Sequence, residues 1–514
     1  MSKTIIIIGA GLAGLSAALQ AAENGCNVKL VSSFPSERAQ SVMAEGGINA
    51  ALNTKDENDS PEEHFTDTIK AACGLADPNA VWGMTQAAPE LVHWLLKLGV
   101  QFNMSGYDDV DLRNFGGQKK KRTAFAQSDT GKQIMTAMID AVRRKEASGM
   151  VERFSHHSFL TLRLCDNICC GCVIRDEYSQ ETVELPGDAV IVATGGMHGL
   201  FGNTTGSLSN TGEVTAELFR LGVPLANGEM IQYHPTTVKC GGKRMLISEA
   251  ARGEGGRLFA MKDGKQWYFM EEKYPELGNL MPRDITAREI WKVSHESEVF
   301  LDMTEISDEI ISNKLSGLAD DCMTYLHKDI RKEPVSVLPG VHYFMGGILV
   351  DEQHRTPIQN LYAAGECCTQ YHGANRLGGN SLLGALYGRR VAAKSACEQA
   401  DVVDLSCATQ IDFPPASQIS EIKQLNKVMQ ETMGVVRNEN TLLNGIQTVQ
   451  ALTGNLPLLG MAVLKSALAR KESRGAHWRE DYPKSNDDDY LKTTVARFDG
   501  KQIQISFVPV PERR

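Results

Sequence analysis

The pattern of apolar and polar positions changes character along the chain. Near the start, Thr4-Ile5-Ile6-Ile7-Ile8 is a β-branched apolar run too short for a helix, which predicts a strand buried on both faces. Helix-forming residues follow over 15–23, and residues 27–31 predict a second strand beside the first. Residues 189–192 predict another buried strand. Beyond residue 415 the pattern is helical, with a short β-like tail over 502–510.

A glycine-rich turn joins the first strand to the first helix. It reads Gly9-Ala10-Gly11-Leu12-Ala13-Gly14, which is the G-x-G-x-x-G fingerprint in its proper context. The first glycine permits the tight turn, the second a close approach of the backbone to a pyrophosphate, and the third close helix packing. The free N–H groups and positive dipole of the helix start favour phosphate, so we expect a dinucleotide here.

Three further features indicate which dinucleotide is bound. The second strand ends at Ser32-Ser33, where a nicotinamide site usually carries an acidic residue for the ribose. Ala193-Thr194-Gly195-Gly196, at the end of another buried strand, is a recurrent feature of flavoproteins with two dinucleotide-binding motifs. Glu366 follows a strand over 360–364 and suits a ribityl hydroxyl. The pattern therefore favours FAD over NAD.

Composition limits the classes of function. The chain has 514 residues, enough for two to four domains, and its 42% hydrophobic and 23% charged content is that of a soluble globular protein. Its net charge of −10 argues against a nucleic-acid partner. Lys119-Lys120-Lys121-Arg122 is interpreted as a solvated loop. The uncharged stretch 4–22 resembles a membrane span or signal peptide, but its glycine spacing argues against both.

The chain holds twelve cysteines, which suggest reduced thiols and not a disulfide scaffold. Cys165, Cys169, Cys170 and Cys172 are clustered and admit an iron–sulfur interpretation. The stronger interpretation is a hairpin turning at residues 166–167, with the cysteines as small apolar strand residues. We expect no metal site.

Residues 38–51 carry a family resemblance. Arg38-Ala39-Gln40-Ser41-Val42-Met43-Ala44-Glu45-Gly46-Gly47-Ile48-Asn49-Ala50-Ala51 closely resembles the flavin-contacting segment of the fumarate reductase/succinate dehydrogenase flavoprotein family. The resemblance continues in order through residues 114–131, 233–236, 248–256, 281–288, 342–347, 372–383 and 469–477. It therefore covers nearly the whole chain.

The resemblance implies an α/β fold in which a Rossmann-like FAD-binding domain carries an inserted α+β capping domain and a C-terminal helical domain. We expect the FAD-binding domain over residues 1–234 and 339–412, and the capping domain over 235–338, where charges rise and strand–helix alternation is lost. The helical domain and its β-like tail should occupy residues 413–514.

The family reaction interconverts fumarate and succinate, and the resemblance assigns roles to matching residues. Arg283 matches the proton donor, and Glu249 and Arg252 match its relay to solvent. Substrate-binding positions are His234, Ser248, His342, Arg376 and Phe115. Cofactor-binding positions are Gly9, Gly11, Ala13, Gly14, Ser32, Gln40, Ser41, Ala44, Gly46, Gly47, Ala193, Thr194, Gly195, Asn203, Gly365, Glu366, Arg376, Ser381 and Leu382.

Two departures from the family pattern are informative. Respiratory members attach FAD through a histidine, but Gln40 occupies that place, so FAD is expected to be noncovalent. Loss of this link should favour fumarate reduction over succinate oxidation. Ser248 replaces the usual threonine and keeps its hydroxyl. Since the chain has no C-x-x-C-H haem motif, electrons should come from an iron–sulfur subunit. We expect the protein in the cytoplasm, or peripheral to the inner face of the membrane through partner subunits, with no span of its own.

Other functions are compatible with the same fold. L-aspartate oxidase is a related noncovalent flavoenzyme, which tends to carry cysteine where Met345 stands and to differ at Gly378-Gly379. A reductase of another unsaturated carboxylic acid is a further alternative. A non-catalytic assembly subunit is disfavoured by the intact set of site residues.

Overall fold

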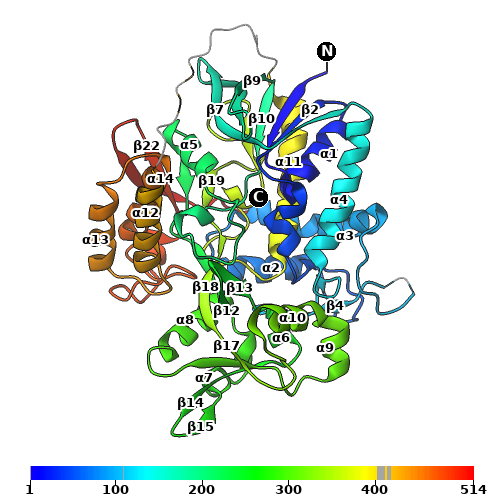
Figure 1. Ribbon diagram of the computed structural model, residues 1–514, viewed down its shortest axis with the longest axis vertical. Helices are drawn as coiled ribbons and strands as arrows, with labels where there is room; N and C mark the ends of the chain where they lie inside the picture. The colour runs from blue at the N-terminus through cyan, green and yellow to red at the C-terminus, as the bar shows by residue number, and fades with distance from the viewer. Residues whose placement is uncertain (1, 108, 402–410, 412, 414–417) are drawn as a thin grey trace.

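The computed structural model describes residues 2–107, 109–401, 411, 413 and 418–514. Figure 1 shows a sheet-and-helix body, a lobe below it formed by the middle of the chain, and a C-terminal helical group to one side. The expected boundary at 412/413 cannot be located because residue 412 lies outside the described residues.

A parallel five-stranded sheet forms the centre of the main body. Its order is β20 (Leu361–Ala363), β10 (Ala189–Val192), β1 (Thr4–Ile8), β2 (Asn27–Ser32) and β6 (Val151–Ser155). Ile5 and Ile7 pack against helices, whereas Ile6 and Ile8 pack against a second sheet, as the two-residue repeat of a strand requires. The first strand is therefore buried on both faces, as its sequence predicts.

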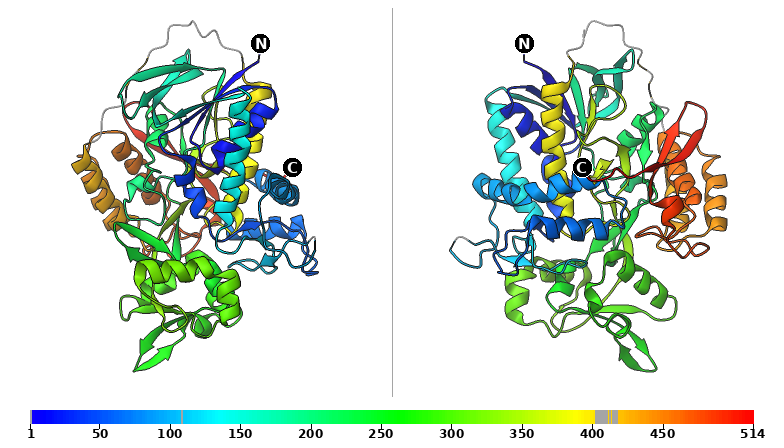
Figure 2. Two further views of the ribbon diagram at one scale, coloured as in Figure 1. Left: turned by 45° about the vertical axis from the view of Figure 1, so that its right-hand side comes forward. Right: turned by 180° about the vertical axis from the view of Figure 1, so that it is seen from behind.

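Helices cover one face of this sheet. They are α1 (Leu12–Glu23), α3 (Pro78–Leu98), α4 (Thr130–Ala147) and α11 (Asn380–Gln399), with α2 (Pro61–Ala71) packed on α3. Figure 2 shows α1, α4 and α11 side by side although α11 follows them by more than two hundred residues. The cofactor fingerprint thus shares a layer with the segment after residue 379.

The other face of the central sheet packs on the cysteine-rich hairpin. Its strands are β7 (His157–Cys165), β8 (Ile168–Asp176) and β9 (Thr182–Pro186). Asp166 and Asn167 have φ values of 49° and 66°, as a two-residue hairpin turn requires. Cys169 and Cys172 are buried in the core with Ile6 and Ile8. Within the described part of the chain, no group of three or more His, Cys, Asp or Glu residues is arranged to hold a metal ion.

The middle of the chain forms the lower lobe, with a hydrophobic core of its own. Its elements are α6 (Glu249–Gly253), β14 (Arg257–Lys262), β15 (Lys265–Trp267), α7 (Phe269–Lys273), α8 (Arg283–Val293), β16 (Val299–Asp302), α9 (Asp308–Lys314), α10 (Ser316–Asp321) and β17 (Val335–Ser336). A sheet of β13 (Lys243–Leu246), β12 (Ile231–Cys240) and β18 (Leu338–Phe344) connects it to the main body. Both β12 and β18 run across the expected domain boundaries.

The C-terminal group contains α12 (Ile419–Thr432), α13 (Glu439–Val449), α14 (Asn455–Ala469) and α15 (Asp487–Tyr490). Its tail strands, β22 (Lys492–Phe498) and β23 (Ile503–Pro509), join a sheet with β11 (Leu225–Ala226), β19 (Gly347–Leu349) and β21 (Cys368–Thr369). α5 (Glu213–Arg220) packs on α14. The C-terminal residues are therefore built into the main body. The remaining short strands are β3 (Ile48–Asn49), β4 (Leu112–Arg113) and β5 (Thr123–Ala124).

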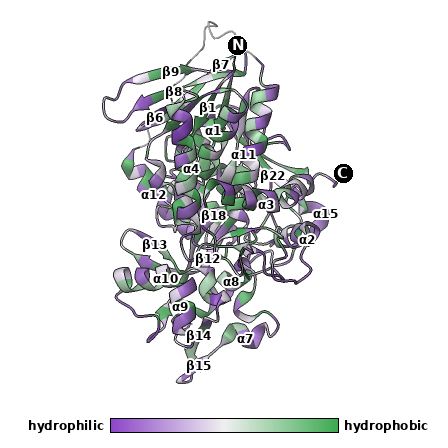
Figure 3. Ribbon diagram, turned by 90° about the vertical axis from the view of Figure 1, so that its right-hand side faces the viewer, coloured by the Kyte–Doolittle hydropathy of each residue, from purple (hydrophilic) through white to green (hydrophobic). Residues whose placement is uncertain are grey.

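Apolar residues gather inside the main body, as the hydropathy colouring in Figure 3 indicates. Among the described residues, no helix has the length and apolar character needed to cross a bilayer. The interpretation of residues 119–122 as a solvated loop is wrong for Arg122, which is fully buried. Its guanidinium donates to Asp59 at 2.8 and 3.1 Å, because a buried arginine requires a carboxylate partner.

Candidate active site

A cavity of ≈ 500 Å³ runs from the glycine fingerprint to the lower lobe. Most of the expected site residues line it, although they come from segments spread over almost four hundred positions. These are Gly9, Gly11, Ala13, Ser32, Gln40, Ser41, Ala44, Gly46, Gly47, Phe115, Ala193, Thr194, Gly195, His234, Ser248, Glu249, Arg283, His342, Gly365, Glu366, Arg376, Ser381 and Leu382.

The dinucleotide end of the cavity is made of backbone. Gly9 has a φ of 110°, and a Cβ there would collide with the carbonyl oxygen of Ala193. Gly14 lies behind the cavity wall, where its missing Cβ lets α1 pack on Gly9. The amide of Leu12 donates to Ser41 Oγ at 3.2 Å, so the start of α1 opens onto the flavin-contacting segment. This arrangement fits a pyrophosphate at the helix start.

The flavin-contacting segment passes close to neighbouring backbone. Gly47 has a φ of 127°, and a Cβ there would collide with the carbonyl oxygen of Ala124. The Oε1 atom of Gln40 is buried and has no hydrogen-bond partner within the described chain. Burial, followed by the charge of Asp321, raises the pKa of Glu45 to about 8. A flat polar group would fit here, because close backbone and an unpaired polar side chain both face the cavity.

The far end of the cofactor region is formed by Glu366 and the start of α11. Glu366 Oε1 accepts from the amide of Phe344 at 3.1 Å and lies 3.7 Å from His198 Nε2. Gly379 precedes α11 with a φ of 83°, so the helix start stays open toward the cavity. The cavity is thus lined by the starts of two helices and by the Glu366 carboxylate, which fits the phosphates, ribityl chain and ring of FAD.

A buried ion-pair cluster lies beyond the cofactor region. Arg283, the first residue of α8, donates from Nε and Nη2 to Glu249 Oε2 at 2.8 and 2.6 Å. The other oxygen of Glu249 accepts from the amide of Gly116 at 3.1 Å and lies 3.4 Å from Arg252 Nη2. Glu249 and Arg252 sit three apart on α6, which Ser248 caps. The helix therefore places a carboxylate between two arginines.

These charges determine the ionisation of Glu249. Burial favours the neutral acid, but the charges of Arg283 and Arg252 and the hydrogen bonds from Arg283 and Gly116 outweigh it, so the pKa of Glu249 is lowered. Arg252 is itself buried and donates to the carbonyl of Asn279 at 2.6 Å. The carboxylate is consequently ionised at neutral pH.

Gln232, which was not among the expected site residues, connects the two arginines of the site. Its Oε1 accepts from Arg283 Nη1 at 3.1 Å and from Arg376 Nη2 at 3.0 Å. Its Nε2 donates to Asn375 Oδ1 and to the carbonyl of Arg376, both at 2.9 Å. Its position between two apolar residues of β12 was the available signal, because a buried amide in a strand needs partners.

Arg376 is fully enclosed. Burial and the charge of Arg283 lower the pKa of Arg376 to about 9. Its guanidinium lies 4.4 Å from the ring centroid of Tyr343. Two guanidinium groups close together in a low-dielectric cavity create a strong preference for an anionic ligand.

Two histidines complete the polar wall. The rings of His234 and His342 lie 5.1 Å apart, and His342 Nδ1 shares a 2.8 Å hydrogen bond with Thr205 Oγ1. Burial and the nearby charge of Arg283 lower the pKa of both histidines well below 6.5. Both are neutral at pH 7 and can each donate one hydrogen bond. The Nε2 atom of His234 is buried without a partner in the described residues.

Three of the expected residues do not line the cavity: Gly14, described above, Arg252 and Asn203. Arg252 lies behind Glu249, and Asn203 lies in a turn where its amide donates to the carbonyl of Phe201 at 2.7 Å. Thr205, two positions later, lines the cavity instead. The role of Asn203 stays a prediction.

Comparisons with known proteins agree with this geometry. The FAD binding domain family matches residues 4–382, and the fumarate reductase flavoprotein C-terminal family matches residues 452–513. The succinate dehydrogenase flavoprotein subunit of Bacillus subtilis is 38% identical over 100% of this chain and 98% of its own length. L-aspartate oxidase of Streptomyces coelicolor is 31% identical over 100% and 94%. A mutant FrdA of E. coli quinol fumarate reductase superposes with a TM-score of 0.89 at 26% identity, over 99% and 97% of the two chains.

Proposed function

This chain belongs to the fumarate reductase/succinate dehydrogenase family of FAD-dependent oxidoreductases, and from that premise we propose that it reduces fumarate to succinate with noncovalent FAD. The observation that carries the proposal is the cluster of Arg252, Arg283 and Arg376 around the single carboxylate of Glu249. These groups sum to a charge of +2. A dicarboxylate dianion would neutralise it.

The substrate carboxylates would be held by Arg376 and by the neutral histidines. A planar guanidinium offers paired donors to one carboxylate, and His234 and His342 each offer a donor to the other. Ser248 adds a hydroxyl at the start of α6. Fixed donors of this kind orient a dicarboxylate without the cost of ordering solvent.

Arg283 would donate the proton. An isolated arginine is a poor acid, with a pKa above about 12. The carboxylate of Glu249 lies 2.6 Å from Nη2 of Arg283, so a proton that Arg283 gives up can be replaced through Glu249. Glu249 and then Arg252 would return the proton from the side away from the cavity. When bound, FAD supplies the hydride for the reduction.

Gln40 supports the noncovalent attachment, because its amide cannot form the bond that a histidine forms in respiratory members. The Gln40 side chain lines the cavity, and its buried Oε1 atom has no hydrogen-bond partner among the described residues. We further propose that an iron–sulfur subunit delivers the electrons.

A comparison of substrates tests the proposal. Protein reduced with dithionite under argon should be reoxidised by fumarate, as followed by recovery of flavin absorbance. L-aspartate oxidase is the second candidate, because a relative with that name aligns over the full chain. Turnover of L-aspartate with oxygen, without reoxidation by fumarate, would establish that candidate. Protein that is not reoxidised by fumarate and does not turn over L-aspartate with oxygen would favour a reductase of another unsaturated acid.

A further inference from the structure

We propose that residues 470–477, which we name the C-terminal brace, position Arg376 for its substrate. This proposal rests on the proposed function, which identifies the substrate as fumarate. The brace comes from the segment after α14 and lies far from Arg376 in sequence. It includes no residue that lines the cavity, so its effect on the site would be indirect.

The loop carrying Arg376 is clamped between two other segments. The amide of Ala374 donates to the carbonyl of Ala72 at 2.9 Å, and the carbonyl of Ala374 accepts from the amide of Ala476 at 2.9 Å. Gly373 and Gly475 have φ values of 50° and 54°, and neither has room for a Cβ. The backbone two residues before Arg376 is thus fixed from both sides.

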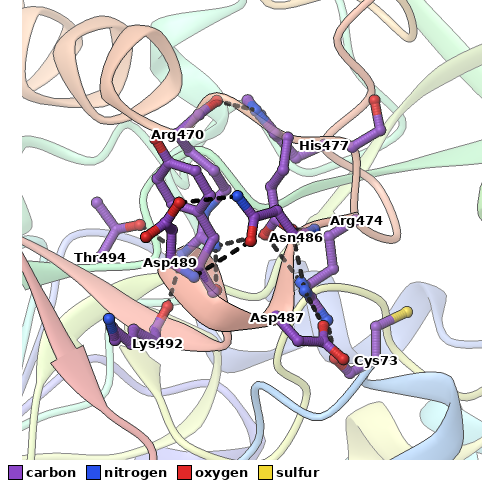
Figure 4. Close-up of polar contacts among 12 residues, drawn as sticks. Cys73, Arg470, Arg474, His477, Asn486, Asp487, Asp489, Lys492 and Thr494 are labelled. Atoms are coloured by element: carbon purple, nitrogen blue, oxygen red, sulfur yellow. Dashed lines mark hydrogen bonds and ion pairs between the residues drawn. The ribbon is translucent and has the colours of Figure 1, made fainter. Parts of the chain in front are cut away.

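A buried charge network holds the brace itself, and Figure 4 shows Arg470 and Arg474 of the brace with Lys492 and Cys73, to which they donate. Arg474 donates to both oxygens of Glu472 at 2.8 and 2.9 Å and to the carbonyl of Cys73 at 3.1 Å. Arg470 donates to Glu472 at 2.8 Å and to Glu229 at 2.7 Å. Arg474 also donates to Asp487, whose side chain is exposed, so both buried arginines have carboxylate partners.

The network fastens the brace to the same segments that hold the Arg376 loop. Arg474 reaches the turn after α2 that also bonds Ala374, and Arg470 reaches Glu229, three residues before Gln232. Arg470 also donates to the carbonyls of Tyr490 and Lys492 at 2.8 and 2.7 Å. Such forked, charge-assisted bonds define orientation more strictly than apolar packing would.

The brace also supports the ring beneath Arg376. Ala374, Ala476 and Tyr343 share one small apolar cluster, and the Arg376 guanidinium lies over the Tyr343 ring. A shift of the brace would therefore move both the backbone before Arg376 and the surface on which its side chain rests. A displacement of a binding group by about 1 Å can lower the reaction rate by about two orders of magnitude.

Two matched glycine variants test the brace in the FAD-loaded protein. In Gly475→Ala, the new Cβ would lie 2.6 Å from the carbonyl oxygen of Ala374. Gly264→Ala is the control, because Gly264 also has a positive φ, 74°, but nothing lies within 4 Å of its Cβ position. Hydrogen exchange of the backbone over residues 372–379 and the Kd of fumarate, from perturbation of flavin absorbance, should be measured in both.

We expect Gly475→Ala to exchange faster over residues 372–379 and to bind fumarate about tenfold or more weakly, with its flavin content preserved. Gly264→Ala should match the wild type. Unchanged exchange and affinity in Gly475→Ala, or equal changes in both variants, would overturn the proposal. A loss of flavin and melting temperature with unaltered affinity per flavin would reduce the brace to a structural role and also overturn it.

Failure of the proposed function would give a different result from failure of the brace proposal. If the wild type binds no fumarate, fumarate is not the substrate. The hydrogen-exchange measurement then still decides whether the brace fixes the Arg376 loop. If Gly475→Ala does not fold, Arg474→Lys replaces it, because lysine keeps the charge but loses the fork that joins Glu472 to Cys73. The same two measurements apply.

Discussion

Arg283 directs two of its nitrogens at one oxygen of Glu249, with Nε and Nη2 at 2.8 and 2.6 Å from Oε2. Its third nitrogen faces Gln232 at 3.1 Å, so the plane of the guanidinium is fixed. The Glu249 side chain is 1% exposed and that of Arg283 is 8% exposed. Replacing either residue leaves the other as a buried charge with a weaker partner, and this consequence underlies the prediction for Glu249→Gln.

Arg283→Ala should abolish reoxidation of the reduced protein by fumarate. Removing a general acid costs about 10² to 10⁴ in rate, and no other described donor occupies the position of Arg283 on α8. FAD should remain bound, because Arg283 lies at the substrate end of the cavity and not at the fingerprint. Stopped-flow recovery of flavin absorbance, together with flavin content, checks both expectations.

Arg257→Ala is the matched control for Arg283→Ala. Arg257 also forms a two-bond pair with a glutamate, Glu271, at 2.9 and 2.7 Å, but the two side chains are 35% and 37% exposed and lie on the lower lobe. The reduced Arg257→Ala variant should react with fumarate at the wild-type rate. A reaction in Arg283→Ala within a few-fold of that rate would exclude Arg283 as the proton donor.

Glu249→Gln should lower stability in a pH-dependent way. The pKa of Glu249 in the folded protein is below its ordinary 4.5, so the unfolded chain binds the proton more readily. The stabilisation is therefore complete above about pH 4.5 and is lost as the pH falls through the folded pKa. At pH 7 the variant should be destabilised by about 3–5 kcal/mol, the cost of breaking a buried pair.

Melting temperatures between pH 7 and about pH 2 check the Glu249 prediction. The difference between wild type and Glu249→Gln should stay constant from pH 7 down to about pH 4.5 and shrink as the pH falls further through the folded pKa of Glu249. Glu37→Gln serves as the control, because Glu37 pairs with Arg143 on the exposed surface. A difference that stays constant over the whole of this pH range would show that the charge of Glu249 is not what stabilises the site.

Local patterns were sufficient for much of the fold. The strand over residues 4–8 and the turn at residues 166–167 were predictable because β-branched runs and two-residue turns are determined by near neighbours. The fingerprint helix starts at Leu12, inside the glycine motif, where sequence predicted only its later residues. The C-terminal tail was predicted as β-like, but its pairing with β11 was not, since 271 positions separate Leu225 from its partner Ala496 and no local pattern encodes that contact.

The candidate site was predictable only where a family motif marked it. Arg283, Glu249 and Arg376 were selected by resemblance, because physics alone disfavours arginine as an acid. Gln232 was missed, and the brace was marked by the resemblance without its contacts to the Arg376 loop, for a common reason. Their significance lies in which buried charges they contact, and those partners come from distant segments. The burial of Arg122 was missed in the same way, because its partner Asp59 is 63 residues away.

Acid precipitation should release FAD from the purified protein. Gln40 offers an amide where a covalent link would need a histidine, so only the backbone cradle and polar contacts retain the cofactor. Trichloroacetic acid should give a colourless pellet and a yellow supernatant whose absorbance and chromatographic retention match FAD. Unfolding with guanidinium at neutral pH should do the same, which separates retention by the fold from acid-labile chemistry. A pellet that remains yellow after both treatments would contradict the noncovalent assignment.

Gln232→Leu should weaken fumarate binding while leaving FAD in place. The amide oxygen accepts from Arg283 and Arg376 at 3.1 and 3.0 Å, so leucine removes the group that spaces the two cations. Each buried donor left without a partner costs about 1–3 kcal/mol, and the KM for fumarate should rise about 10- to 100-fold. Steady-state kinetics with a viologen donor measure the change, with exposed Gln450→Leu as the control. A KM equal to that of the control, at unchanged flavin content, would mean that Arg283 and Arg376 keep their positions without Gln232.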